Sequence, residues 1–312
     1  MHLPPHWQPD YPLARLSTWR IGGPARYYAA PASEAQLRAD LRLAAEEQLP
    51  VLAVGGGSNL LFSDRGYDGL ILQLPGYRPS DLDPTGGRMP CRGAGIVQLA
   101  AADSLATTVR RLAERGWAGL HWAESIPGTV GGAIINNAGA YGGQIADRLE
   151  SVGVMRPDGT EETWPAERLA LTYRSSALKG QEPTQAFLLS GAFRLERESP
   201  DVLIKAVEEI RRRRHRKLPS LPSCGCVFRN PEGQVAGRLI EEAGLCGLRA
   251  GDAQVSRQHA NFIVNRGDAR AEDVLQLIRE VRERVRQAFG LELALEVQPV
   301  GFQPVALPVS WI

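Results

Sequence analysis

Two glycine-rich segments of this chain could bind a ligand through the main chain itself. The first, residues 55–59, reads Gly-Gly-Gly-Ser-Asn and follows the apolar run 51–54, which predicts a tight turn at the end of a buried strand. Small residues leave backbone N–H groups accessible, and such groups bind phosphate or pyrophosphate. Leu60 stands where a Rossmann dinucleotide fingerprint would have its third glycine, so the segment does not match that motif. A purely structural turn remains the alternative.

The second segment, residues 126–143, contains six glycines. It is too apolar for a solvated linker and too rich in glycine for an ordinary helix. Glycine permits positive φ angles and close approach of the backbone to another group. The segment is therefore either a buried loop of tight turns or backbone wrapped around a large ligand.

A dense basic run, residues 211–217, reads Arg-Arg-Arg-Arg-His-Arg-Lys. It could be a solvated helix end, where cations oppose the partial negative charge of the terminus. It could also bind an anion, either a nucleotide diphosphate or a nucleic acid. Because the run contains no aromatic residue on which a base could stack, nucleic acid is the less favoured ligand.

Other reactive side chains stand singly. Cys224 and Cys226 lie in a small-residue loop and are separated by one residue, which is too close for the usual zinc-ligand spacing, and we expect no metal site. Buried, inert thiols are the alternative interpretation of this pair. Arg174 and Glu296, each taken alone, are compatible with an ordinary surface residue.

Composition narrows the class of protein. The chain has 312 residues, a formal net charge of +1 and 43% hydrophobic residues, which predicts two domains or three small ones with a real core. The near-zero charge argues against a general nucleic-acid or membrane-surface binder, and no apolar stretch is long enough for membrane insertion. We see no secretion signal and expect a cytoplasmic protein with free thiols. No Gly-Lys pair occurs, which excludes a P-loop.

Apolar spacing and turn residues predict mixed helices and strands. A helix capped by Ser33 should run to residue 48, with Leu37, Leu41 and Ala44 on one face. Three further helices are expected, at 96–115 with Gly116 closing it, from Ser199 and Pro200 to Arg216, and around Val274, Leu277, Ile278, Val281 and Val285 with Gly290 closing it. Strands are expected at 51–54, 60–62, 69–72, 151–155, 187–189, 192–195, 262–264 and 291–297.

Seven segments, taken in order, resemble one family, the UDP-N-acetylenolpyruvoylglucosamine reductases (MurB), which are flavoenzymes of peptidoglycan precursor synthesis. Each segment is moderately specific, and their order and spacing together are very specific. The matching segments are 18–25, 55–61, 119–133, 137–142, 173–176, 225–231 and 259–265.

The resemblance implies an α+β fold. Residues 1–200 would form a two-subdomain FAD-binding region of the vanillyl-alcohol-oxidase/p-cresol-methylhydroxylase (PCMH) type, and residues 201–312 a C-terminal α+β substrate-binding domain. Because the segment 176–187 is short and holds no extra module, the chain is similar to the compact second type of the family.

The resemblance also implies three catalytic residues. Arg174 matches the arginine that polarises the substrate carboxylate, and Glu296 matches the late acidic residue paired with it. Cys226 stands where the family usually has a serine that donates a proton. A guanidinium is always charged and grips two carboxylate oxygens, and a thiol with a reference pKa of about 8.5 is protonated at neutral pH, so both residue types suit these tasks.

The remaining implied contacts are with ligands. The substrate would be a UDP-linked enolpyruvyl amino sugar, touched by Tyr173, Lys217, Asn230 and His259. NADPH would supply the hydride, and FAD would be bound non-covalently because no tether residue is evident. The implied FAD contacts are Gly55, Gly56, Gly57, Ser58, Asn59, Leu60, Ser125, Ile126, Pro127, Gly128, Thr129, Gly132 and Ala133.

Two rival interpretations remain open at this point. One is another flavoprotein of the same fold that oxidises or dehydrogenates a small alcohol. The other is a nucleic-acid-binding protein that uses the basic run. We expect a monomer that binds no nucleic acid, and a flavin absorbance spectrum would separate the two classes.

Overall fold

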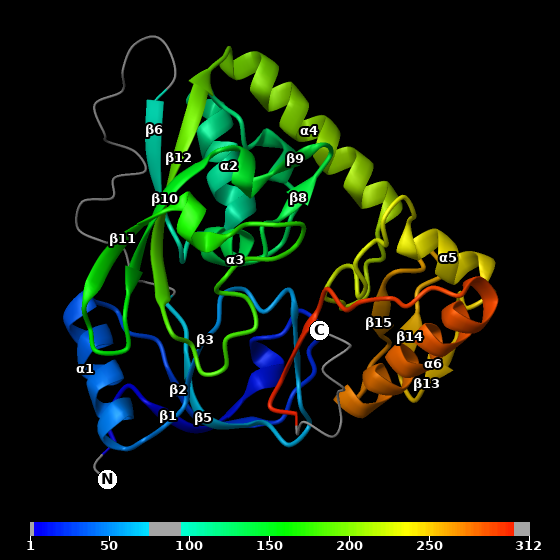
Figure 1. The fold of residues 1–312 in the computed structure, drawn as a ribbon, viewed down its shortest axis with the longest axis horizontal. Helices are drawn as coiled ribbons and strands as arrows, with labels where there is room; N and C mark the ends of the chain where they lie inside the picture. Colours follow the sequence, from blue (N-terminus) through cyan, green and yellow to red (C-terminus); the bar gives the residue numbers. More distant parts are fainter. Residues whose placement is uncertain (1–2, 75–94, 303–312) are drawn as a thin grey trace. The chain divides into compact units, whose positions relative to one another are not determined.

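A computed structural model describes residues 3–74 and 95–302 (Figure 1). Cys91, one of the four cysteines of the chain, lies outside the described residues. The chain forms two compact units, each assembled from segments that are distant in sequence. Unit 1 comprises Met1–Gln8, Tyr28–Gly56 and Gly69–Arg214, and unit 2 comprises Pro9–Tyr27, Gly57–Asp68 and His215–Ile312. The functional division at residue 200 stays a prediction.

The first sheet has the strand order β1-β2-β5-β3. β3 pairs in parallel with β5, from Val51 opposite Leu70 to Ala53 opposite Leu72, which confirms the strands expected at 51–54 and 69–72. The strands are β1 (Gln8–Pro12), β2 (Pro24–Ala29), β3 (Val51–Ala53) and β5 (Tyr67–Leu72).

Helix α1 (Glu34–Glu46) forms as its sequence predicts. The Ser33 hydroxyl accepts the N–H of Gln36 at 3.2 Å, and the Gln36 side chain accepts the N–H of Ala32 at 2.8 Å. Both contacts satisfy amides that have no partner within the first turn. The apolar face predicted for this helix is buried at Leu37, Leu41 and Ala44.

An antiparallel sheet within unit 1 has the order β11-β10-β12-β6, with β7 paired to the far end of β12. Helices α2 and α3 pack beside it in Figure 1, and the buried cluster between them includes Val130, Val152, Leu188 and Phe193. The elements are β6 (Gly95–Ala100), α2 (Leu105–Glu114), β7 (Trp117–Ala118), α3 (Val130–Ile135), β10 (Leu149–Met155), β11 (Glu161–Pro165) and β12 (Phe187–Arg197).

Three sequence predictions for this part of unit 1 were wrong. The helix expected at 96–115 is a strand, β6, followed by the shorter helix α2, which Ser104 caps. Residues 96–100 become a strand because β12 offers them a partner, with Leu99 opposite Gly191. The two strands expected at 187–189 and 192–195 are one continuous strand, β12, and the glycine-rich segment 126–143 contains a short helix, α3.

Helix α4 (Pro200–Lys217) begins at Pro200 and ends at Lys217, in agreement with its prediction. None of the helices within residues 3–74 and 95–302 combines the length and apolar character that crossing a membrane requires.

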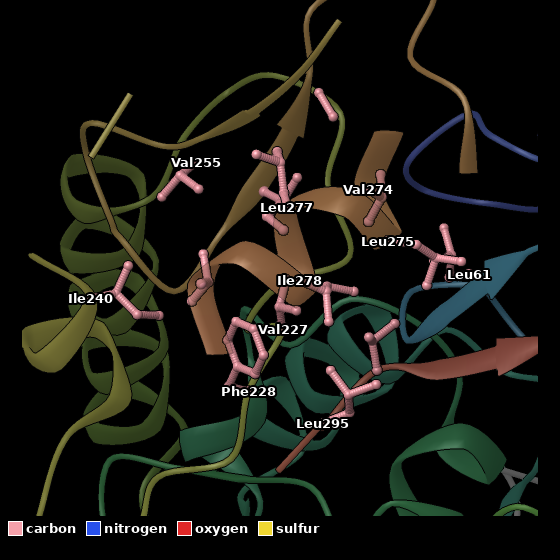
Figure 2. Packing of buried hydrophobic residues seen from close by; sticks show 14 of the residues in the cluster. Leu61, Val227, Phe228, Ile240, Val255, Val274, Leu275, Leu277, Ile278 and Leu295 are labelled. Carbon is pink, nitrogen blue, oxygen red and sulfur yellow. The ribbon is translucent and has the colours of Figure 1, made fainter. Parts of the chain in front are cut away.

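In unit 2, helix α6 packs on a three-stranded sheet of order β13-β14-β15. Figure 2 shows the core, in which Val274, Leu277 and Ile278 of α6 lie among Val255 and Phe228. The elements are β4 (Leu60–Phe62), α5 (Ala236–Glu242), β13 (Arg249–Ala250), β14 (Ala253–Val255), β15 (Ile263–Asn265), α6 (Ala271–Phe289) and β16 (Gln298–Val300).

Contacts from a distant segment fix the start of α6. The Asp64 carboxylate accepts the N–H groups of Ala271 and Glu272 at 2.9 and 3.1 Å, which caps the helix from the loop after β4. Gly290, at φ +68°, ends the helix as expected. The strand predicted at 291–297 was wrong: only Leu295 forms an isolated bridge, and the last strand, β16, lies at Gln298–Val300, parallel to β4.

Candidate active site

In unit 1 the two glycine segments lie against each other. A Cβ atom on Gly56 would be 2.7 Å from the Cα of Gly128, and one on Gly55 would be 2.5 Å from Oγ1 of Thr129. Contacts this close are possible only because neither residue has a side chain. The two segments therefore form one backbone surface in unit 1.

The peptide planes of this surface have a defined direction. The Gly55 carbonyl accepts from the Gln73 amide at 2.9 Å, and the Gly128 carbonyl accepts the N–H of Leu105 at 3.1 Å. In a trans peptide the N–H of the next residue points opposite to the carbonyl, so the N–H groups of Gly56 and Thr129 are directed away from these partners. Main-chain donors beside glycines fit the pyrophosphate of a flavin dinucleotide.

In unit 2, residues 57–60 complete the first glycine-rich loop, and Asn59 contacts Glu296. Gly57, at φ +59°, packs so tightly that a Cβ there would lie 1.6 Å from the Leu16 carbonyl oxygen. The Asn59 side chain donates from Nδ2 to the backbone carbonyl of Glu296 at 3.0 Å, and Leu60 begins strand β4. Unit 2 therefore joins predicted flavin residues to a predicted catalytic residue.

Cys226 and Glu296 stand on two adjacent segments of unit 2. Phe228 and Leu295 form an antiparallel bridge, and the N–H of Glu296 donates to the Val227 carbonyl at 2.8 Å. Residues 226 and 296 are thus about one register position apart. Cys226 is half-buried, so part of its side chain is accessible to a substrate.

Cys224 has a different environment from Cys226. Its side chain is 4% exposed, and Sγ lies 3.3 Å from both Oγ1 of Thr18 and the carbonyl oxygen of Leu60. Burial raises the pKa of the Cys224 thiol to about 11, while its hydrogen bonds act in the opposite direction. Cys224 is accordingly a protonated packing residue at neutral pH.

The segment that carries His259 is held against the Cys226 loop by Asn261. The Asn261 side chain accepts the N–H of Phe228 at 2.9 Å and donates to the Phe228 carbonyl at 2.8 Å. Its own carbonyl accepts the N–H of Val227 at 2.9 Å. Sequence reasoning did not single out this buried asparagine, although a polar residue inside the apolar segment 260–264 was a signal for such a role.

The predicted substrate residues of unit 2 differ in their surroundings. Asn230 accepts the N–H of Ala236 at 3.0 Å and so stabilises the start of α5. The His259 ring lies 4.7 Å from the ring of Phe262, centroid to centroid. Lys217 is the exposed last residue of α4.

Much of the basic run interacts locally. Arg212 and Arg213 both pair with Glu209 on the same helix, at 3.0 and 2.8 Å.

Arg211 interacts electrostatically with Glu124, whose side chain is 3% exposed and lies 3.4 Å from Nε of Arg110. Burial raises the pKa of Glu124 above its ordinary value, although both arginines lower it. This buried acid, beside the second glycine segment, is a further residue that sequence reasoning missed.

Arg174 occupies the tip of a tight turn in unit 1. The N–H groups of Thr172 and Ser175 each donate to the other residue's carbonyl, at 3.1 and 3.2 Å, and Arg174 has φ +56°. Its guanidinium donates to the carbonyl of Gly139, in β8 (Gly139–Ala140), and to that of Asn137. The neighbouring Tyr173 is 48% exposed, with its ring centroid 5.2 Å from the Arg174 guanidinium carbon.

Comparison with known proteins decides the family. Residues 25–164 match the FAD binding domain, and residues 216–300 match the UDP-N-acetylenolpyruvoylglucosamine reductase C-terminal domain. The UDP-N-acetylenolpyruvoylglucosamine reductase of Chloroflexus aurantiacus is 46% identical over 298 residues, which cover 95% of this chain and 98% of that protein. The chain belongs to the UDP-N-acetylenolpyruvoylglucosamine reductase family.

Other members of the reductase family agree. The reductase of Gloeobacter violaceus is 41% identical, with 94% of this chain and 96% of that protein covered. The crystal structure of the reductase from Thermus caldophilus superposes with a TM-score of 0.77 at 35% identity, covering 93% of this chain and 97% of that one. The α+β FAD-binding fold expected from the resemblance is therefore confirmed. The roles of the individual site residues stay predictions.

Proposed function

We propose that this protein is an FAD-containing, NADPH-dependent oxidoreductase that reduces UDP-N-acetylglucosamine enolpyruvate to UDP-N-acetylmuramate in peptidoglycan precursor synthesis. Near full-length identity of 41–46% to reductases of that name carries the proposal. The backbone surface of Gly55, Gly56 and Gly128 independently supports a dinucleotide cofactor.

Bound FAD would supply the hydride-transfer chemistry between NADPH and the substrate, and the protein would orient and shield it. The residues that would hold it non-covalently are those of segments 55–60 and 125–133. In unit 1, the N–H groups of Gly56 and Thr129 point away from Gln73 and Leu105, and they suit the pyrophosphate.

Arg174 would stabilise the negative charge that develops on the substrate carboxylate when hydride adds to the enolpyruvyl double bond. Its turn is fixed by main-chain hydrogen bonds, so the guanidinium is positioned before the substrate arrives. A preorganised donor of this kind typically lowers the barrier by about 3–4 kcal/mol.

Cys226 would donate the proton that the neighbouring carbon requires, and Glu296 would be the acidic residue that the resemblance pairs with Arg174. Its half-buried position is compatible with contact to substrate, whereas the buried Cys224 is unsuited to the task. Tyr173, Lys217, Asn230 and His259 would contact the substrate, with Lys217 on its diphosphate.

We further propose that residues 1–200 hold the flavin and residues 201–312 the substrate. We also propose that the protein acts as a cytoplasmic monomer and binds no nucleic acid. The local pairing of Arg212 and Arg213 with Glu209 supports the last point, because it partly neutralises the basic run.

The decisive experiment measures NADPH oxidation by the purified, flavin-loaded protein with and without the enolpyruvyl nucleotide. We expect rapid oxidation only with the nucleotide, and one muramate product for each NADPH consumed. Reduction of the flavin by a small alcohol instead would favour the oxidase alternative. A colourless protein that cannot be reconstituted with FAD would contradict the proposal altogether.

A further inference from the structure

Lys179 contacts the main chain of the residue proposed to bind the substrate carboxylate. Its ammonium group donates to the backbone carbonyl of Arg174 at 2.8 Å, and the side chain is half-buried. The proposed reaction assigns no task to Lys179, and the contact therefore points to a separate function of this side chain.

The Arg174 backbone needs support of this kind. At φ +56° it lies in the left-handed region, which costs a residue with a side chain roughly 1–2 kcal/mol. Strained residues of this type persist where the surroundings fix them, and they concentrate at functional sites. The direction of the Arg174 carbonyl depends on its ψ angle, so an ammonium bound to that oxygen favours one conformation of the turn.

Neighbouring contacts hold the rest of the turn in place. The Asn137 amide donates to the Thr172 carbonyl at 2.8 Å, and the Ser176 hydroxyl donates to the Ile135 carbonyl at 2.6 Å. These bonds attach the two ends of the turn to the glycine-rich segment. The Lys179 bond acts at the tip, on Arg174 itself.

The choice of lysine is itself informative in this chain. Of its 36 basic residues only Lys179, Lys205 and Lys217 are lysines. A compact ammonium on a flexible stem can reach a single carbonyl oxygen, whereas a planar guanidinium is suited to paired acceptors. The presence of lysine at position 179 of an arginine-rich chain is therefore consistent with a need for a compact donor to one carbonyl oxygen.

We propose that Lys179 is a positioning residue for Arg174: its ammonium holds the turn in the conformation that presents the guanidinium to the substrate carboxylate. This inference rests on the proposed role of Arg174. Lys179 acts through the main chain and need not touch the substrate.

The test uses the holoenzyme and separates the two half-reactions by stopped-flow absorbance of the flavin. In Lys179→Met we expect reduction of FAD by NADPH within about two-fold of the wild type. Reoxidation of the reduced flavin by the enolpyruvyl nucleotide should slow by roughly 10- to 100-fold, the range for losing a hydrogen bond from a charged donor. The matched control is Lys205→Met, which removes an exposed lysine of α4 and should change neither rate.

A double-mutant cycle distinguishes positioning from general stability. In an Arg174→Ala background, Lys179→Met should cause little further slowing, because the residue it positions is gone. If Lys179→Met does not fold, Lys179→Arg retains the charge and should show a smaller loss confined to reoxidation.

The inference is overturned if reoxidation is normal in the Lys179 variants while Arg174→Ala is slow, or if the two changes are additive. A normal Arg174→Ala enzyme would overturn both this inference and the proposed role of Arg174, so the two failures are distinguishable.

Discussion

The Asn59 side chain donates to the backbone carbonyl of Glu296 across 237 residues of sequence, at 3.0 Å. The Asn59 carbonyl in turn accepts the N–H of Gln298 at 2.9 Å. The two bonds bracket the start of the parallel pairing between β4 and β16. They tie the glycine loop to the segment that carries the late acidic residue.

Replacement of this asparagine should therefore affect stability and chemistry together. Asn59→Asp keeps the shape but cannot donate, and it sets a carboxylate against the Glu296 carbonyl. We expect the free energy of unfolding to fall by about 1–3 kcal/mol and flavin reoxidation by substrate to slow. Urea denaturation and stopped-flow absorbance measure the two effects, and unchanged values in both would show that the contact is incidental.

Gly56→Ala should weaken FAD binding. The added methyl group would lie 2.7 Å from the Gly128 Cα and force the two loops apart. We expect FAD binding to be at least about ten-fold weaker, which is a loss of about 1.4 kcal/mol of binding free energy. Titration of the apoprotein with FAD measures this change.

The control is Gly180→Ala, at an open turn with φ +74°, where a methyl group meets no atom within 4 Å. It should cost stability through backbone strain without weakening FAD binding.

In the wild type, all flavin should leave the denatured chain, and flavin that precipitates with the protein would contradict non-covalent binding.

Lys217→Ala should raise the KM for the enolpyruvyl nucleotide and barely change reduction of FAD by NADPH. The physical reason is the loss of one charge near the proposed diphosphate position, and the effect should diminish with salt. Lys205→Ala serves as the control for charge alone. A KM that is unchanged and insensitive to salt would assign the end of α4 a structural role.

Cys226→Ala should leave reduction of FAD by NADPH intact and slow reoxidation by substrate by roughly 10²–10⁴-fold, the usual span for a general acid. Cys226→Ser should retain much of the activity, since a hydroxyl can donate the same proton. A fully active Cys226→Ala enzyme in single turnover would assign the proton to another donor.

Cys224→Ala is the matched comparison. Because Cys224 is a buried core residue, this change should lower the melting temperature and leave the rate of reoxidation within about three-fold of wild type. Its pKa of about 11 also predicts that alkylation near neutral pH spares Cys224 in the folded protein. Preferential alkylation of Cys224 would contradict the burial seen here.

Glu124→Gln should stabilise the protein relative to the wild type, and the difference in the free energy of unfolding should increase with pH. Burial raises the pKa of Glu124 in the folded state, so the folded protein holds this proton more tightly than the unfolded chain does. Wild-type stability therefore falls as the pH rises above the ordinary glutamate pKa, whereas the glutamine variant has no charge to bury. Urea denaturation at about pH 4 and about pH 7 should show a difference that grows with pH.

Glu114→Gln, on the exposed face of α2, is the control and should show little pH-dependent difference. A difference for Glu124→Gln that is equally flat would mean that Arg110 and Arg211 fully compensate the buried charge.

Features that depend on a few neighbouring residues could be predicted from the sequence. The Ser33 cap, the buried face of α1 and the stop at Gly290 follow from caps and apolar spacing, which act within one or two helical turns. The order of the glycine, arginine and cysteine motifs was sufficient to identify the family. The expected FAD-binding fold followed from that resemblance.

Only the tertiary structure decided features that need a distant partner. Residues 96–100 have spacing compatible with a helix, yet they form β6 because β12 supplies hydrogen-bond partners about 90 residues away. The Asn59–Glu296 and Lys179–Arg174 bonds end on backbone carbonyls, which every residue possesses, so nothing in the side-chain sequence identifies the acceptor. The sequence by itself determined which groups were available for chemistry, and the folded chain determined which main-chain atoms hold them in place.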